Sequence, residues 1–294
     1  MRVGICLPYM KPGQDRGTTL GWSRAIDAGP FSTLSCGERI TGPTQDMRIT
    51  LAAAAAVTER VRIAPSLYVL PMHSAVWAAK EIATLDVLSA GRVTVTVGVG
   101  GREKDYQAVG ASFARRHARL DEQVAEMRRI WAGEPPVPGA DPVGPRPEQP
   151  GGPPIWAGAM GPKSIRRAAH WAQGVYTFTM NGDPAPVRYW IGEIRTAWQE
   201  AGRTDRPEIV SGFWCSLAPK DADAKLKGYV YDYLKIAGED TARAVAGTMG
   251  MSSPEAVRAG LDALEELGCD EVLLSPATAE IAEVQRLAEI IVRR

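Results

Sequence analysis

Residues 49–110 decide the fold class and read ITLAAAAAVTERVRIAPSLYVLPMHSAVWAAKEIATLDVLSAGRVTVTVGVGGREKDYQAVG. An Ala-rich helical run leads into a β-branched strand at 61–64, and a second helical run at 74–89 leads into a strand at 92–97. Strands that alternate with helices predict a parallel sheet, because a parallel pair needs a crossover long enough to hold a helix. Such sheets bind ligands at the carboxyl ends of their strands.

The same alternation continues along the whole chain. Strand-like runs occur near residues 3, 33, 61, 93, 155, 175, 210 and 272, and helical runs separate them. Eight β/α units in 294 residues predict an α/β fold, a (β/α)8 TIM barrel that forms one domain over residues 1–294. An open doubly wound sheet has similar spacing and remains the alternative.

One segment, residues 133–154, interrupts the pattern and reads GEPPVPGADPVGPRPEQPGGPP. Proline and glycine at this density cannot continue a helix or a strand. We expect a long surface insertion after the fourth β/α unit. A loop of this length in a compact domain is usually functional or disordered.

Composition excludes several classes of protein. The chain has 34 Lys and Arg against 34 Asp and Glu, so neither nucleic acid nor another polyanion is an expected partner. It has no apolar run of transmembrane length, and its start, MRVGICLPYM, lacks the features of a signal peptide. We expect no membrane association and a cytoplasmic location. The four cysteines lie far apart without a CxxC motif, which argues against a metal site or a disulfide framework.

The turn after the fifth strand is the first candidate site. Gly158, Gly161 and Ser164 lie where the strand passes into a helix, so backbone N–H groups there favour an anion. Lys163 and the pair Arg166 and Arg167 add positive charge. The alternative is an ordinary turn followed by a solvated basic helix face.

A second glycine-rich turn, residues 98–101, follows the fourth strand. It is no dinucleotide fingerprint, because Glu103 stands where a third glycine would be due. It indicates either close approach of the backbone to a flat ligand or only a tight turn.

Glu38, Arg39 and His73 are the candidate catalytic residues. Glu38 and Arg39 follow the second strand, where they could do acid–base or orienting work or form only a surface ion pair. Arginine stays charged at working pH, so Glu38 is the better proton-transfer candidate and Arg39 could anchor an acidic substrate. His73 follows the third strand and is the histidine best placed for a barrel mouth.

Several motifs resemble the bacterial luciferase-like superfamily of flavin- and deazaflavin-dependent enzymes. The most specific is ATLDVLSAGR, and the others are TLAAAAAVTERVRI, GVGGREKDYQAVG, RLDEQVAEMRRIWAGE, PPIWAGAMGPKSIRRAAHWAQGVY and SSPEAVRAGLDALEELGCDEVLL. The resemblance covers about residues 44–290. It implies a TIM barrel, often dimeric, that holds FMN or the deazaflavin F420 at its C-terminal mouth.

The resemblance also implies positions for the cofactor. The ring would lie against Ser66 and Leu67, near a non-proline cis peptide, and against Gly98. The phosphate would lie on the turn formed by Gly158, Ala159, Met160, Gly161, Pro162, Lys163 and Ser164. The Pro-rich segment 133–154 would form a variable lid over the substrate.

Two departures from the family pattern stand out. Many members have an acidic residue and then histidine after the second strand, whereas this chain has Glu38 and Arg39, which removes the usual proton-transfer histidine. Many also have Asp-Gly before the sixth strand, where this chain has Gln173 and Gly174. We expect the second change to affect only the turn that leads into the strand.

These observations favour an F420-dependent oxidoreductase that transfers a hydride between the deazaflavin and a small organic substrate. The acidic tail of F420 would suit Lys163, Arg166 and Arg167. The alternatives are an FMN-dependent monooxygenase, which needs a flavin reductase as partner, and a ligand-binding barrel without catalysis. The resemblance also favours a homodimer.

Overall fold

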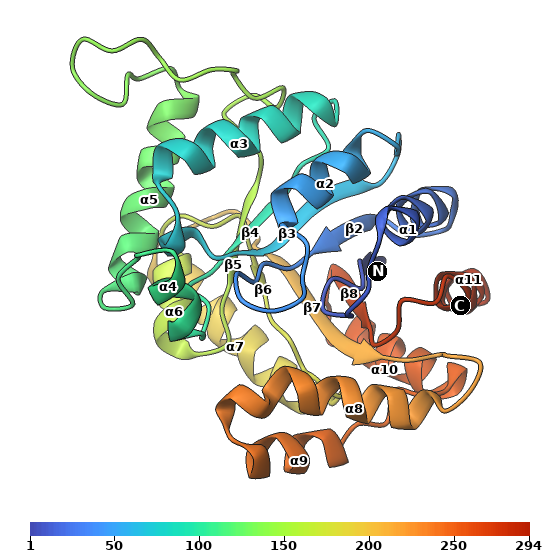
Figure 1. Ribbon diagram of the computed structural model, residues 1–294. Helices are drawn as coiled ribbons and strands as arrows, with labels where there is room; N and C mark the ends of the chain where they lie inside the picture. Colours follow the sequence, from blue (N-terminus) through green and yellow to red (C-terminus); the bar gives the residue numbers. More distant parts are fainter.

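The strands form one closed parallel barrel in the computed structural model, which describes residues 1–294 (Figure 1). In chain order the strands are β1 (Arg2–Cys6), β2 (Thr33–Cys36), β3 (Arg62–Tyr68), β4 (Val95–Val97), β5 (Ile155–Gly158), β6 (Gly174–Tyr176), β7 (Glu208–Cys215) and β8 (Glu271–Pro276). Each strand pairs with the next, and β1 pairs with β8 in the register Val3 to Val272. The (β/α)8 prediction is confirmed. The open sheet is wrong, because the pairing of β1 with β8 leaves no free edge.

Helices connect the strands and surround the barrel (Figure 1). They are α1 (Arg16–Ala28), α2 (Met47–Ala55), α3 (Ala75–Leu88), α4 (Glu103–Ala108), α5 (Arg116–Trp131), α6 (Pro162–Ala168), α7 (Pro184–Glu200), α8 (Ala222–Leu234), α9 (Glu239–Gly247), α10 (Pro254–Glu266) and α11 (Ala282–Val292), with 3-10 turns η1 (Leu70–Met72) and η2 (Lys235–Ala237). The sequence pattern misses α4, whose six residues are too few to show helical periodicity.

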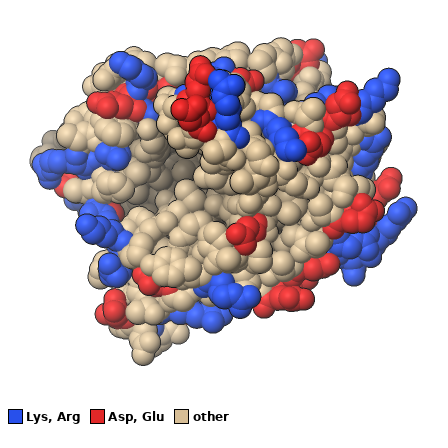
Figure 2. Space-filling view, turned by 90° about the horizontal axis from the view of Figure 1, so that it is seen from below, with Lys and Arg blue, Asp and Glu red and all other residues tan.

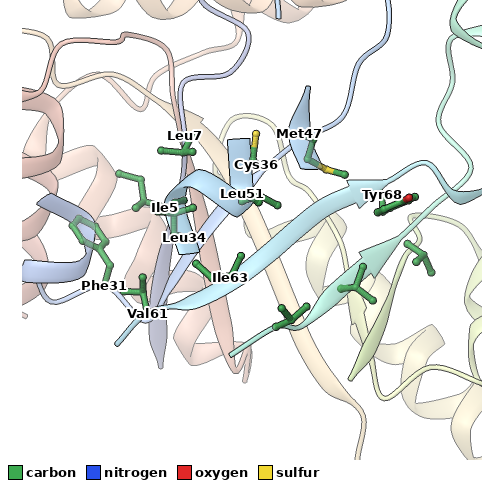
Figure 3. Packing of buried hydrophobic residues seen from close by; sticks show 14 of the residues in the cluster. Ile5, Leu7, Phe31, Leu34, Cys36, Met47, Leu51, Val61, Ile63 and Tyr68 are labelled. Carbon is green, nitrogen blue, oxygen red and sulfur yellow. The ribbon is translucent and has the colours of Figure 1, made fainter. Parts of the chain in front are cut away.

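The strand register places the core side chains in line. Ile5 of β1 lies opposite Leu34 of β2, and Leu34 lies opposite Ile63 of β3. All three are fully buried, and Leu51 of α2 is buried with them (Figure 3). Burial of one such side chain stabilises the fold by about 1.5–3 kcal/mol. This packing fixes the end of β2, where the candidate residues begin.

The segment 133–154 is a long excursion without helix or strand, but its place contradicts the expected lid. It follows the end of α5 and packs against the end of α3 and the start of β4. The backbone N–H of Gln149 donates to Asp86 at 2.9 Å, and its side chain donates to the carbonyl of Val93 at 2.8 Å. Lys80 also donates to the carbonyl of Gly144 at 2.6 Å. In Figure 1 the excursion projects at the upper left, whereas α8 lies at the bottom. The excursion therefore lies toward the amino ends of the strands and not over their carboxyl ends.

An apolar surface lies on the helices α2 and α3. Ile49 is 73% exposed, Trp77 62% and Leu88 58%, and all three border a groove of about 410 Å³ between the helices. Arg48 and Glu81 form an ion pair at 3.2 Å on the same groove. Elsewhere, none of the helices is both long and apolar enough to span a bilayer.

Candidate functional site

The mouth of the barrel holds a cavity of about 260 Å³ at the carboxyl ends of the strands. This volume lies near the lower end of the range for small-molecule sites. Its lining includes the charged side chains Glu38, Arg39 and Arg102, the aromatic side chains Tyr176, Phe178, Trp214, Tyr229 and Tyr233, and the pair Ser66 and Leu67. The face shown in Figure 2 has a hollow bordered mainly by uncharged atoms, with charges of both signs scattered around it.

Glu38 and His73 form a carboxylate–imidazole pair beside this cavity. The distance between Glu38 Oε1 and His73 Nε2 is 2.7 Å, and Glu38 Oε2 accepts the N–H of Val69 at 2.7 Å. Glu38 lines the cavity, whereas His73 lies behind it and does not line it. The carbonyl of His73 accepts from Gln123 at 2.7 Å, which fixes the loop after β3. His73 thus reaches Glu38 from the loop after β3.

Arg39 and Arg102 bring positive charge to the same wall. Arg39 follows β2, and its Nε is buried without a hydrogen-bond partner. Arg102 precedes α4 and donates from Nη2 to the carbonyl of Tyr233 in α8 at 2.9 Å. Burial, and then the charge of Arg39, lowers the pKa of Arg102. The surface ion pair between Glu38 and Arg39 is wrong, because Glu38 bonds to His73 and Val69 instead.

The other wall is aromatic. The ring of Phe178 meets that of Trp214 edge-on with centroids 4.9 Å apart, and Trp214 lies 5.1 Å from Tyr233. Tyr229 and Tyr233, both in α8, stack with centroids 6.4 Å apart. Burial raises the pKa of Tyr229 well above the ordinary phenol value, so this hydroxyl stays neutral. Helix α8 therefore covers the mouth in the place expected for the segment 133–154.

The third strand carries the expected backbone irregularity. The peptide between Ser66 and Leu67 is cis, and the register of β3 against β4 shifts there. Strand β3 runs to Tyr68, beyond the predicted end at residue 64, and Pro65 lies inside the strand opposite Cys36. The expectation of a cis peptide at this position is confirmed.

Leu67 occupies the space beside two of the predicted cofactor-binding glycines. A Cβ on Gly98 would lie 2.9 Å from Leu67 Cδ1, and a Cβ on Gly158 would lie 2.3 Å from Leu67 Cδ2. Both glycines are therefore required for close packing of Leu67 across the ends of β4 and β5. The group that both glycines approach is the branched side chain of Leu67, and Leu67 rather than either glycine lines the cavity.

The turn after β5 has free backbone donors. Four backbone amides have no acceptor within the chain, those of Met160, Gly161, Lys163 and Ser164. The hydroxyl of Ser164 does not accept from them, because it donates to the Gly161 carbonyl at 2.8 Å. Helix α6 has only seven residues, so its dipole adds little to these donors. Met160 is the residue of this turn that lines the cavity, and Lys163 is exposed. Of the predicted basic groups, Arg167 is held by Asp121.

The structure brings the sequence-derived candidates together only in part. Glu38, Arg39, Ser66, Leu67 and Met160 line the cavity. The predicted residues outside its lining are His73, Gly98, Gly158, Ala159, Gly161, Pro162, Lys163 and Ser164. Sequence reasoning missed Arg102 and the aromatic wall, although Tyr229 and Tyr233 share a helix face at i and i+4.

The second departure from the family pattern has the expected local role. The Gln173 side-chain oxygen accepts the N–H of Ile155 at 3.0 Å and also a hydrogen of Arg128 at 3.3 Å. These bonds join the starts of β5 and β6 at the end of the barrel opposite the cavity. Gln173 therefore shapes the turn and does not reach the mouth.

The cysteines at the mouth are poor nucleophiles. Burial raises the pKa of Cys6 to about 11, although Ser35 donates to its sulfur and partly opposes this shift. Burial also raises the pKa of Cys36 well above its ordinary value. Both thiols therefore stay protonated near neutral pH.

Comparison with known proteins identifies the family. The model of the luciferase-like monooxygenase family matches residues 1–271. The chain belongs to that family. Its barrel and its cavity at the carboxyl ends of the strands agree with this membership.

Relatives differ in cofactor. An uncharacterised protein of Mycobacterium tuberculosis is 34% identical over 176 residues, which cover 57% of this chain and 61% of the relative. The chain thus matches about three fifths of the length of that curated relative. An F420-dependent secondary alcohol dehydrogenase, solved with an F420–acetone adduct, has a TM-score of 0.81 at 19% identity, with 98% and 97% of the chains covered. The oxygenating component of 3,6-diketocamphane monooxygenase from Pseudomonas putida, solved with FMN, has a TM-score of 0.75 at 17% identity, with 100% and 98% covered.

Proposed function

We propose that this family member is an F420-dependent oxidoreductase acting on a small organic substrate at the barrel mouth. The observation that carries the proposal is the Glu38–His73 pair, in which Glu38 lines a cavity that has one aromatic wall. A ring system fits between aromatic side chains, and a carboxylate in contact with it can exchange a proton. The likeness to an F420-dependent alcohol dehydrogenase supports this choice of chemistry.

The residues present fit an anionic cofactor with a flat head. The free amides of Met160, Gly161, Lys163 and Ser164 would hold a phosphate, and Met160 connects this turn to the cavity. Exposed Lys163 would lie near the acidic tail of F420. The ring would extend from Met160 into the cavity, where it would contact Leu67.

The reaction needs a hydride and a proton. Bound F420 supplies or accepts the hydride at C5. Glu38 holds the matching proton at the carboxyl group that faces the cavity, and gives it to or takes it from the substrate oxygen. His73 holds Glu38 Oε1 in position at 2.7 Å, while the N–H of Val69 keeps the other carboxyl oxygen in place.

Titration of the purified protein with F420 and with FMN tests the proposal. We expect quenching of F420 fluorescence with saturation at one site, and weaker binding of FMN. Preferred binding of FMN would support the FMN-dependent monooxygenase, which needs a reductase partner. Failure to bind either cofactor would favour a barrel without catalysis.

Replacement of Gly161 with valine tests the position of the phosphate. The backbone at Gly161 is extended, and a Cβ there meets only Ser164 Oγ at 3.9 Å, so valine fits the fold. Its bulk would block approach to the free amides. We expect the affinity for F420 to fall at least about tenfold, the equivalent of one charge-assisted hydrogen bond. Gly250→Val is the matched control, because Gly250 is also open and lies outside the cavity. Equal affinities in both variants would remove the phosphate from this turn.

We also propose a homodimer formed by the apolar surface of α2 and α3. This surface carries both a protruding Trp77 and a groove, so a two-fold axis would let each copy fill the groove of the other. The Arg48–Glu81 pair places one positive and one negative charge on the border of the groove. In a two-fold dimer, each charge can therefore face the opposite charge of the other copy. Sedimentation should show a dimer that Trp77→Glu converts to monomer. The exposed Tyr189→Glu on α7 is the control, and a monomeric wild type would contradict the proposal.

A further inference from the structure

Two guanidinium groups line one wall of the cavity without a carboxylate partner. Neither Arg39 nor Arg102 forms a salt bridge in the structure. The buried Nε of Arg39 has no acceptor, and its Nη1 faces only the sulfur of Met10 at 3.8 Å. Arg102 donates one hydrogen bond, to the Tyr233 carbonyl. Both side chains are partly exposed and line the cavity, so an anionic ligand there could reach them.

The carboxylates nearby are already bound elsewhere. Glu38 accepts from Val69 and pairs with His73. Asp105, which also lines the cavity, accepts the backbone N–H groups of Ile40 at 3.3 Å and Thr41 at 3.2 Å. Neither can turn to the arginines without leaving its own donors unpaired. A carboxylate on a ligand would supply the counter-charge that these two side chains do not.

We propose that the mouth selects a substrate carrying a carboxylate on a planar apolar body, with the carboxylate bound by Arg39 and Arg102. Guanidinium groups match the geometry of a carboxylate, and Phe178 and Trp214, which also line the cavity, match an aromatic ring. The ring of Tyr233 lies beside Arg102, 5.6 Å from its guanidinium carbon. The proposal rests on the proposed function for the reaction itself. It adds the substrate class, an aromatic or similarly flat carboxylic acid with a reacting group within reach of Glu38.

The position of the arginines separates this anion from the cofactor phosphate. Arg39 follows β2 and Arg102 follows β4, whereas the free amides of the phosphate site follow β5 and precede α6. The aromatic wall comes from β6, β7 and α8 and lies with the arginines on the cavity. The acid therefore belongs to the substrate, and a cofactor bound through its phosphate leaves the arginines free.

Calorimetric titration of the F420-loaded protein with benzoate and with benzamide tests the proposal. Both probes have the same ring and nearly the same shape, but only benzoate is charged. We expect benzoate to bind at least tenfold more tightly than benzamide. Arg39→Gln should abolish this preference while F420 still binds as in the wild type. Arg129→Gln, at an exposed position on α5, is the control and should leave the preference intact.

Each outcome has one meaning. Equal binding of benzoate and benzamide to wild type, or an unchanged preference in both Arg39→Gln and Arg102→Gln, would overturn the carboxylate site. Displacement of F420 by benzoate would assign the arginines to the cofactor and also overturn it. Gly161→Val should weaken F420 and spare benzoate in the unloaded protein. If neither cofactor binds but benzoate does, the proposed function fails and the anion site stands. If Arg39→Gln does not fold, Arg39→Lys, which keeps the charge and loses the fork, should reduce the preference.

Discussion

Replacement of Glu38 with glutamine is expected to lower the turnover rate by about 10²–10⁴-fold, the usual contribution of general acid–base catalysis. Glutamine keeps an oxygen for the N–H of Val69 and the length of the side chain, so the loop should hold its position. It cannot carry the proton. We therefore expect the affinity for F420 to stay within about twofold and only the rate to fall. The assay follows oxidation of reduced F420 by 4-formylbenzoate, a carbonyl compound in the proposed substrate class.

Substitution of His73 tests whether the carboxylate of Glu38 is catalytic or only structural. It touches Glu38 and not the cavity, so it is a positioning residue in this geometry. His73→Asn should reduce the rate less than Glu38→Gln and should move the pH profile of turnover, because Glu38 loses its partner. The double variant should be no slower than Glu38→Gln alone. Turnover with an unchanged rate and pH profile in Glu38→Gln would assign the proton to another group at the mouth.

The fold was predictable because hydrophobic periodicity is local. Each strand near the predicted positions carries a short β-branched or apolar run, and each turn carries glycine or proline at its end. Helix α10 shows how well local signals work, since Ser253 Oγ accepts the N–H of Ala256 at 3.2 Å and Pro254 opens the first turn as expected. The predicted end of β3 was wrong because the β-branched run stops at residue 64, whereas the strand continues through Pro65, which pairs with Cys36 of β2.

The site was predictable only where a side chain and its strand end are neighbours in sequence. Glu38 and Arg39 directly follow β2, so their place at the mouth follows from the fold. The link between Glu38 and His73 spans 35 residues and depends on how the loops after β2 and β3 meet. Gly98 and Gly158 indicate a close approach to the backbone, but a glycine does not show which group approaches, so their contact with a cofactor stays a prediction. Here the approaching group is Leu67.

The segment 133–154 was misplaced for a topological reason. A helix that follows a barrel strand runs back toward the amino ends of the strands, so α5 delivers the segment to that end. The insertion precedes β5 and follows a helix, and this order excludes a position over the mouth. Composition showed that the segment lacks helix and strand, but only its place between α5 and β5 shows where it lies.

Glu283 should dominate the pH dependence of the free energy of unfolding between pH 4.5 and about 7. It lies fully buried in α11, where Oε1 accepts the N–H of Leu217 at 2.6 Å and Oε2 has no partner. Burial raises its pKa from the ordinary 4.5 to about 7, although the Leu217 bond partly opposes this shift. Between these two values the native state holds a proton that the unfolded state has lost. The free energy of unfolding therefore falls as pH rises through this window, by about 3 kcal/mol in total.

Glu283→Gln removes this ionisation and isolates its contribution. The amide oxygen of glutamine can still accept from Leu217, so at pH 4.5 wild type and variant should unfold at similar urea concentrations. At pH 8 the wild type carries a buried charge and the variant does not, so the variant should be more stable by about 2–3 kcal/mol. Glu266→Gln, an exposed glutamate on α10, should change stability by less than about 0.5 kcal/mol at either pH. Other carboxylates titrate equally in wild type and Glu283→Gln, so they cancel in the difference. The difference in the free energy of unfolding between wild type and Glu283→Gln should grow from pH 4.5 to pH 8. If it does not, Glu283 stays charged in the folded protein, and water reaches its free oxygen.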